Sequence, residues 1–109
     1  MASLCEVLPP VTVPGSEYWP VRSIPFIMTG SDELAEGVKL ALGGGSAVIM
    51  AHHGLVATGK DLKKAMTAAE YVEENARIAY RLRMAGCESE IDKDSIAALK
   101  EALSQGKAI

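Results

Sequence analysis

The sequence predicts one α/β domain over residues 1–109, with about three helices and three to four short strands. Short apolar runs bracketed by glycines indicate buried strands, and segments with apolar residues three and four positions apart indicate amphipathic helices. Hydrophobic residues make up 49% of the chain. A chain of this length buries roughly 65% of its unfolded surface. Because no internal repeat or linker divides the sequence, we expect a single globular unit.

All five prolines lie in the first quarter of the chain, at positions 9, 10, 14, 20 and 25. Proline has no backbone N–H to donate to a neighbouring strand. Residues 1–23 are therefore expected to be mostly an extended, irregular lead-in that wraps around the rest of the fold. A short strand is expected over residues 23–28, with Pro25 near its start and Thr29 and Gly30 at its end.

Ser31 is a good helix N-cap, and Asp32 and Glu33 follow it where carboxylates interact favourably with the helix dipole. Apolar residues at four-residue spacing then predict a helix over residues 32–42. Three consecutive glycines, residues 43–45, end it. A phosphate-binding loop needs its glycines after a strand and before a helix. The order here is the reverse, so nucleotide binding is not expected.

A long helix is predicted over about residues 61–85, with Gly86 as the residue that ends it. Its apolar residues recur at three- and four-residue steps and are expected on the buried side: Leu62, Ala65, Met66, Ala69, Val72, Ala76, Ala79 and Leu82. Glu73 and Glu74 are expected on a solvated face, with Glu73 four residues before Arg77. Opposite charges at this spacing stabilise a helix by about 0.2–0.5 kcal/mol.

The C-terminal segment predicts one more helix. Asp92 can cap it, and its apolar side consists of Ile96, Leu99 and Leu103. Residues 104–109 are expected to be a frayed end.

Composition excludes several classes of function. The net charge is −3, with no run of like charges, so neither nucleic acid nor an anionic membrane surface is an expected partner. The apolar runs fall short of the ~20 residues that a membrane span needs, and the N-terminus lacks the features of a signal peptide. Cys5 and Cys87 stand far apart and belong to no local metal or redox motif, which favours two reduced structural thiols. The expected location is the cytoplasm.

The two histidines of the chain lie between its densest apolar segments. Residues 47–51 and 55–57 are predicted to be short buried strands, so His52 and His53 are expected at a strand break inside the core rather than on a solvated loop. In an extended segment neighbouring side chains point to opposite faces, so at most one of them can bind a given metal directly. A buried structural histidine is the commoner role for such a residue, and a metal ligand is the alternative. The residues alone leave both open.

The segment around the histidines resembles a known family. Residues 48–51 are an apolar run, residues 52–57 are His-His-Gly-Leu-Val-Ala, and Gly59 leads into a long helix rich in Ala and Glu. This order is similar to the Asn/His-His-Gly-Leu segment of the class II, zinc-dependent sugar-phosphate aldolases, the aldolase/adducin family. Residues 24–35 resemble the family's Ile-Pro strand and following Glu-Leu helix, and residues 91–103 resemble its last helix. The resemblance thus covers nearly the whole chain.

The resemblance implies a three-layer α/β/α sandwich around a largely antiparallel sheet. It also implies that His53 is a zinc ligand, while His52 occupies a variable Asn/His position beside it. In the family, zinc acts as a Lewis acid on the donor substrate and a carboxylate moves the proton. The implied reaction is retro-aldol cleavage of a sugar phosphate to dihydroxyacetone phosphate and an aldehyde.

The chain departs from the family pattern in what it lacks. The family's other zinc ligands are a His-x-His pair and a glutamate that is also the acid/base, and they lie in an N-terminal half together with the phosphate-binding loop. None of these is found here, so the chain resembles the C-terminal half of such an enzyme. The resemblance therefore implies no catalytic residue within this chain and one zinc ligand, His53, so zinc would need ligands from outside the chain.

Three functions remain open. Completed by a separate N-terminal half, the chain is expected to act on a sugar phosphate. Alternatively, it is a non-catalytic, adducin-like interaction and oligomerisation module. In both cases, uncovered strand edges and an uncovered helix face favour self-association or binding of the missing half. A third possibility is a small metal-binding protein in which His53 joins ligands from a symmetry-related copy.

Overall fold

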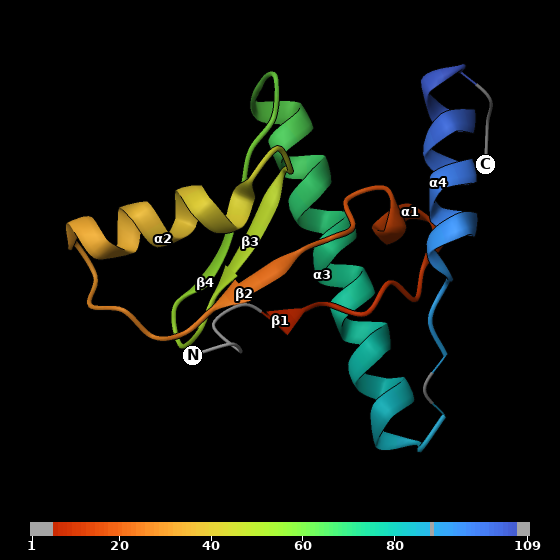
Figure 1. Ribbon diagram of the computed structural model, residues 1–109. Helices are drawn as coiled ribbons and strands as arrows, with labels where there is room; N and C mark the ends of the chain where they lie inside the picture. The colour runs from red at the N-terminus through yellow and green to blue at the C-terminus, as the bar shows by residue number, and fades with distance from the viewer. Residues whose placement is uncertain (1–5, 88, 107–109) are drawn as a thin grey trace.

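The computed structural model describes residues 6–87 and 89–106 (Figure 1). Its elements in chain order are β1 (Glu6–Val7), α1 (Val13–Ser16), β2 (Arg22–Ile24), α2 (Asp32–Leu42), β3 (Ala47–Met50), β4 (Gly54–Ala57), α3 (Leu62–Met84) and α4 (Lys93–Ser104). The strands form one sheet in the order β1-β2-β3-β4. The β2–β3 pair is parallel, and the β1–β2 and β3–β4 pairs are antiparallel. The predicted α/β class and the largely antiparallel sheet are confirmed.

The described residues form three layers, with α2 against one face of the sheet and α3 against the other (Figure 1). Alternation along β3 separates two cores, because successive side chains of a strand point to opposite faces. Ala47 packs with Val21 and Val72 on the α3 side. Val48, which is fully buried, packs with Ile24 and Ala41 on the α2 side. This is the sandwich that the family resemblance implied.

The helices α2 and α4 begin at their expected caps, and α3 begins where it was predicted, with Asp61 as its N-cap. The Ser31 side chain accepts a hydrogen bond from the Leu34 N–H at 3.1 Å. Asp61 and Asp92 accept equivalent bonds from the N–H groups of Lys64 and Ser95, both at 2.8 Å. These bonds satisfy donors that the first turn of a helix leaves unpaired. The predicted starts of α2, α3 and α4 are confirmed.

The end of α3 also follows the sequence. Gly86 has φ = +68°, a left-handed conformation that glycine adopts without steric cost. The Cys87 N–H then bonds to the Leu82 carbonyl at 2.9 Å, and the Gly86 N–H bonds to the Arg83 carbonyl at 3.1 Å. This pair of bonds is a Schellman motif.

The predicted buried side of α3 is wrong in part. Leu62 and Met66 are 84% and 58% exposed, and the fully buried residues of the helix are Ala68, Val72 and Asn75. The prediction counted apolar residues only, whereas the helix turns the polar Asn75 inward to bind the lead-in. Glu73 and Glu74 are exposed as expected. Arg77 forms its ion pair with Glu74 rather than with Glu73, and this hydrogen bond raises the pKa of Arg77 above its usual value.

The second strand is shorter than predicted, and it starts one residue earlier. It spans Arg22–Ile24 instead of residues 23–28, so Pro25 follows its end. The Ile24 carbonyl still accepts a hydrogen bond from the Ala51 N–H at 3.0 Å. Pro25 has no N–H with which to continue the ladder. Beyond it the chain leaves the sheet, and Phe26 is 58% exposed.

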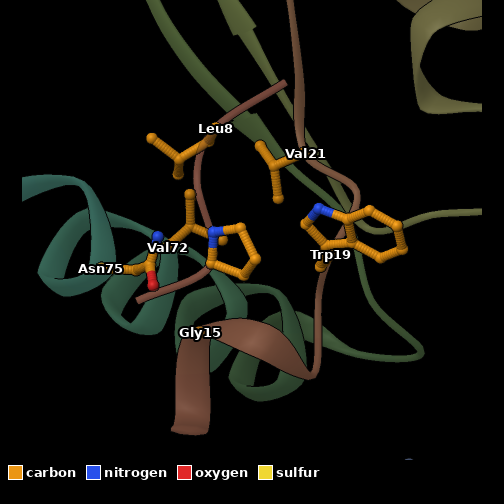
Figure 2. A pocket seen from close by; sticks show the side chains of 7 residues that line it. Leu8, Gly15, Trp19, Val21, Val72 and Asn75 are labelled. Atoms are coloured by element: carbon orange, nitrogen blue, oxygen red, sulfur yellow. The ribbon is translucent and has the colours of Figure 1, made fainter. Parts of the chain in front are cut away.

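The lead-in wraps around the fold as expected, but it is more regular than predicted. It contains β1 and the single helical turn α1, whose N-cap Thr12 accepts a bond from the Gly15 N–H at 3.0 Å. Asn75 holds this segment against α3, because its Nδ2 donates to the Pro9 carbonyl at 2.8 Å. Figure 2 shows the small cavity at this junction. It measures about 10 Å³, and its lining includes Leu8, Trp19, Val21 and Val72.

The last helix rests on the lead-in. Ile96 is 2% exposed, and the Ile91 N–H bonds to the Pro10 carbonyl at 2.8 Å. Lys93 places its ammonium group 5.9 Å from the centre of the Trp19 ring. Ser104, expected in a frayed end, is still helical, and residues 107–109 lie outside the described part of the chain.

Two further expectations concern the cysteines and the membrane. Cys87 is a free, exposed thiol, and Cys5 lies outside the described residues. Over the residues that the structure describes, none of the helices has the length and apolar character that crossing a bilayer requires.

Candidate functional site

The histidine pair lies in the three-residue turn that joins β3 to β4. Met50 pairs with Gly54 across the hairpin, and the His53 N–H closes the turn by bonding to the Met50 carbonyl at 3.0 Å. His52 and His53 are both exposed. The expectation of a strand break inside the core is therefore wrong. A connection this short between antiparallel strands must lie at the end of the sheet, where no layer covers it.

His52 has an unusual backbone conformation. Its φ is +61°, the only positive value of a non-glycine residue in the described part of the chain. Asn, Asp and His are the residue types enriched in this left-handed region. The conformation of the turn thus gives a physical reason for a histidine at position 52.

Phe26 contacts the His52 ring from the segment that follows β2. The two ring centroids are 6.3 Å apart and the planes meet at 75°, an edge-to-face arrangement. Sequence reasoning did not single out Phe26. The available signal was its position two residues after Ile24, which pairs with Met50 at the entrance of the turn.

His53 is accessible as a single metal donor, but the described residues do not complete a metal site. Within residues 6–87 and 89–106, no group of three His, Cys, Asp or Glu side chains could hold a metal ion. A zinc site takes four ligands, three of them from protein even in open catalytic sites. The chain by itself therefore does not fit the zinc that its resemblance implies.

Two hollows among the described residues, both larger than the cavity of Figure 2, lie away from the histidine turn. A groove of about 620 Å³ runs between the lead-in and the C-terminal half of α3. A hollow of about 340 Å³ lies beside the end of α2 and includes Arg22 and Lys100 in its lining. Neither is lined by His52 or His53, so the turn projects from the surface rather than into one of these hollows.

The three-layer fold and the His-His-Gly turn between β3 and β4 are together those of a class II aldolase-type chain. The family model described as "Class II Aldolase and Adducin N-terminal domain" matches residues 1–80. This match covers more than half of the chain, and the protein belongs to this family.

Particular relatives agree with the assignment. The chain is 35% identical over 78 residues to the L-fuculose phosphate aldolase of Haemophilus influenzae, covering 72% of this chain and 35% of the relative. It is 37% identical over 63 residues to the 3-oxo-tetronate 4-phosphate decarboxylase of the same organism, covering 58% of this chain and 30% of that one.

A solved L-fuculose 1-phosphate aldolase superposes with a TM-score of 0.85 at 26% identity, over 91% of this chain and 47% of the other. The chain thus spans about a third of the length of these curated relatives and about half of the solved structure.

Proposed function

We propose that this chain is the C-terminal half of a class II aldolase-family enzyme, a single domain over residues 1–109 that an N-terminal half completes. In the completed protein, His53 is one zinc ligand and His52 its neighbour, and the reaction is zinc-dependent retro-aldol cleavage of a sugar phosphate. The products would be dihydroxyacetone phosphate and an aldehyde. The cytoplasm is the proposed location, which agrees with the free thiol of Cys87.

One observation carries the proposal. The chain superposes on a solved L-fuculose 1-phosphate aldolase over 91% of its length, and its His-His-Gly turn lies on the surface. An exposed imidazole can join ligands from another polypeptide, whereas a buried one with both nitrogens bonded could not. The names of the relatives include an aldolase and a decarboxylase, and both reactions break a carbon–carbon bond. A phosphorylated sugar or sugar acid is therefore the supported substrate class.

The test mixes the purified chain with a candidate N-terminal half and measures zinc content and cleavage of L-fuculose 1-phosphate. We expect about one zinc per complex and measurable release of dihydroxyacetone phosphate. His53→Ala should abolish zinc uptake, while His52→Ala should leave most of it. No zinc uptake by the wild-type mixture would contradict the proposal, as would equal uptake by the His53→Ala chain.

The second candidate is a non-catalytic, adducin-like interaction module. It is supported by the lack of a three-donor metal group among the described residues and by large apolar side chains left exposed on α3. Light scattering of the purified chain separates this module, which should self-associate, from an enzyme half that waits for a different partner.

A further inference from the structure

Helix α3 carries a second apolar stripe besides the one it buries. At about 100° per residue, this stripe lies roughly 100° around the helix from the buried face of Ala68, Val72 and Asn75. Its members follow one another at steps of three and four residues, apart from one interruption by Glu73. We name them the outer stripe: Leu62, Met66, Ala69, Ala76, Tyr80 and Met84.

The large residues of the outer stripe are exposed. Leu62, Met66, Tyr80 and Met84 are 84%, 58%, 65% and 70% exposed. Large apolar side chains aligned on one surface mark an interaction site more often than single exposed residues do. The alanines between them are small enough to let a second backbone approach closely.

The C-terminal part of the outer stripe opens into the groove of about 620 Å³. Ala76 and Tyr80 line one wall of this groove. The opposite wall belongs to the lead-in and consists of Val7, Leu8, Pro9 and Val11. In Figure 1 this half of α3 extends past β1 at the edge of the sheet.

The spacing of the stripe selects a helix as the occupant. Alternating steps of three and four residues bring one line of side chains against another helix, as in helical bundles. A second copy of the same helix fits poorly. A two-fold pair centred on the stripe places Glu73 opposite the other Glu73, whether the helices run parallel or antiparallel, and like charges in contact oppose association.

The length of the matched fold indicates where such a helix comes from. This chain covers 47% of the L-fuculose 1-phosphate aldolase chain on which it superposes with a TM-score of 0.85. A comparable length of that architecture has no counterpart here. We infer that the outer stripe is the docking face for an amphipathic helix from that remaining part. The helix carries apolar residues at steps of three and four and a Lys or Arg opposite Glu73.

This inference rests on the proposed function for the identity of the partner. Its test titrates the full 109-residue chain with a recombinant polypeptide comprising the unmatched part of the solved aldolase, using isothermal titration calorimetry. Met66→Asp should weaken binding at least tenfold. The matched control is Leu40→Asp, which changes a residue that is 78% exposed on α2 and should leave binding unchanged.

The charge is tested in the same way. Glu73→Lys should weaken binding at least fivefold, and Glu36→Lys on α2, with the same change of charge, should not. Circular dichroism and urea unfolding check that each variant is folded.

Three outcomes would overturn the inference. The first is the absence of binding by the wild-type chain, and the second is binding that neither Met66→Asp nor Glu73→Lys weakens. The third is a homodimer that Met66→Asp dissociates, because a second copy would then occupy the stripe. Stripe-dependent binding without zinc uptake or cleavage would refute the proposed function and leave the inference standing.

Discussion

The side-chain oxygen of Asn75 accepts hydrogen bonds from both the backbone N–H and the hydroxyl of Thr12, at 3.0 and 3.1 Å, across 63 residues of sequence. It also accepts from the Val11 N–H at 2.9 Å. Asn75 is 2% exposed. One buried amide therefore satisfies several backbone groups of a segment whose prolines leave it few bonds of its own.

Replacing Asn75 by leucine should lower the free energy of unfolding by about 3 kcal/mol. The change leaves the N–H groups of Val11 and Thr12 and the Pro9 carbonyl without their partner in part-buried surroundings. Each group that loses its partner away from water costs about 1–3 kcal/mol. Urea unfolding followed by circular dichroism measures the loss. Glu74→Leu, on the exposed side of the same helix, is the control and should shift stability by about 0.5 kcal/mol at most. A loss below about 1 kcal/mol for Asn75→Leu would show that the lead-in does not depend on this residue.

Gly15 is required by close packing against Asn75. A Cβ atom at this position would lie 2.5 Å from the Asn75 Cβ and 2.6 Å from the Thr12 hydroxyl oxygen. Gly15→Ala should therefore cost about 1–3 kcal/mol, since neither neighbour can move without breaking the hydrogen bonds. Gly44→Ala is the matched control, because its Cβ would meet no atom within 4 Å. Equal melting temperatures for the two variants would contradict this account.

The left-handed conformation of His52 predicts an ordered series of variants. His52→Asn should preserve stability to within about 0.5 kcal/mol, because Asn tolerates φ near +61°. His52→Val should lose about 1–3 kcal/mol, because a branched Cβ is strained there. Denaturant unfolding gives the order, and His53→Val serves as the control at an exposed neighbour without positive φ. A stable His52→Val protein would indicate that the turn adopts another conformation in solution.

Because Asp92 caps α4, we expect the stability of the fold to depend on pH in the acidic range. Hydrogen bonds from the Ser95 backbone N–H and hydroxyl lower the pKa of Asp92 below its ordinary value of 3.8. A carboxyl group with a lowered pKa in the folded state stabilises the fold above its unfolded pKa. This contribution is lost as the pH falls through the lower, folded-state pKa.

Thermal unfolding of the wild type and Asp92→Ala tests this prediction. The melting temperatures should differ at pH 6 and converge only once the pH has fallen below the lowered, folded-state pKa of Asp92, where the carboxylate is protonated. Glu101→Ala, at an exposed site later in the same helix, controls for loss of charge. A difference that persists unchanged at the lowest pH would assign the effect to something other than the charge of Asp92.

Local features of the fold followed from the sequence because local chemistry controls them. Three helices begin at the capping residues Ser31, Asp61 and Asp92, and α3 ends at Gly86. The sequence indicates these ends because capping bonds and a left-handed φ involve residues only a few positions apart. The ordered motifs around His53 were likewise enough to identify the family, which the match to residues 1–80 confirms. That His53 binds zinc stays a prediction.

The sequence by itself determined the helices α2, α3 and α4 and the two strands that flank the histidines, where most of these helices begin and end, and which family the chain belongs to. It did not predict β1 or α1 in the lead-in. Only the tertiary structure decided that Asn75 turns inward while Leu62 and Met66 stay outside, and that the histidine turn stands on the surface. Apolar periodicity cannot choose between two stripes of one helix when a buried hydrogen-bonding partner lies 63 residues away. It also cannot tell a break within a core from a tight hairpin, because the pairing of β3 with β4 is itself a tertiary contact.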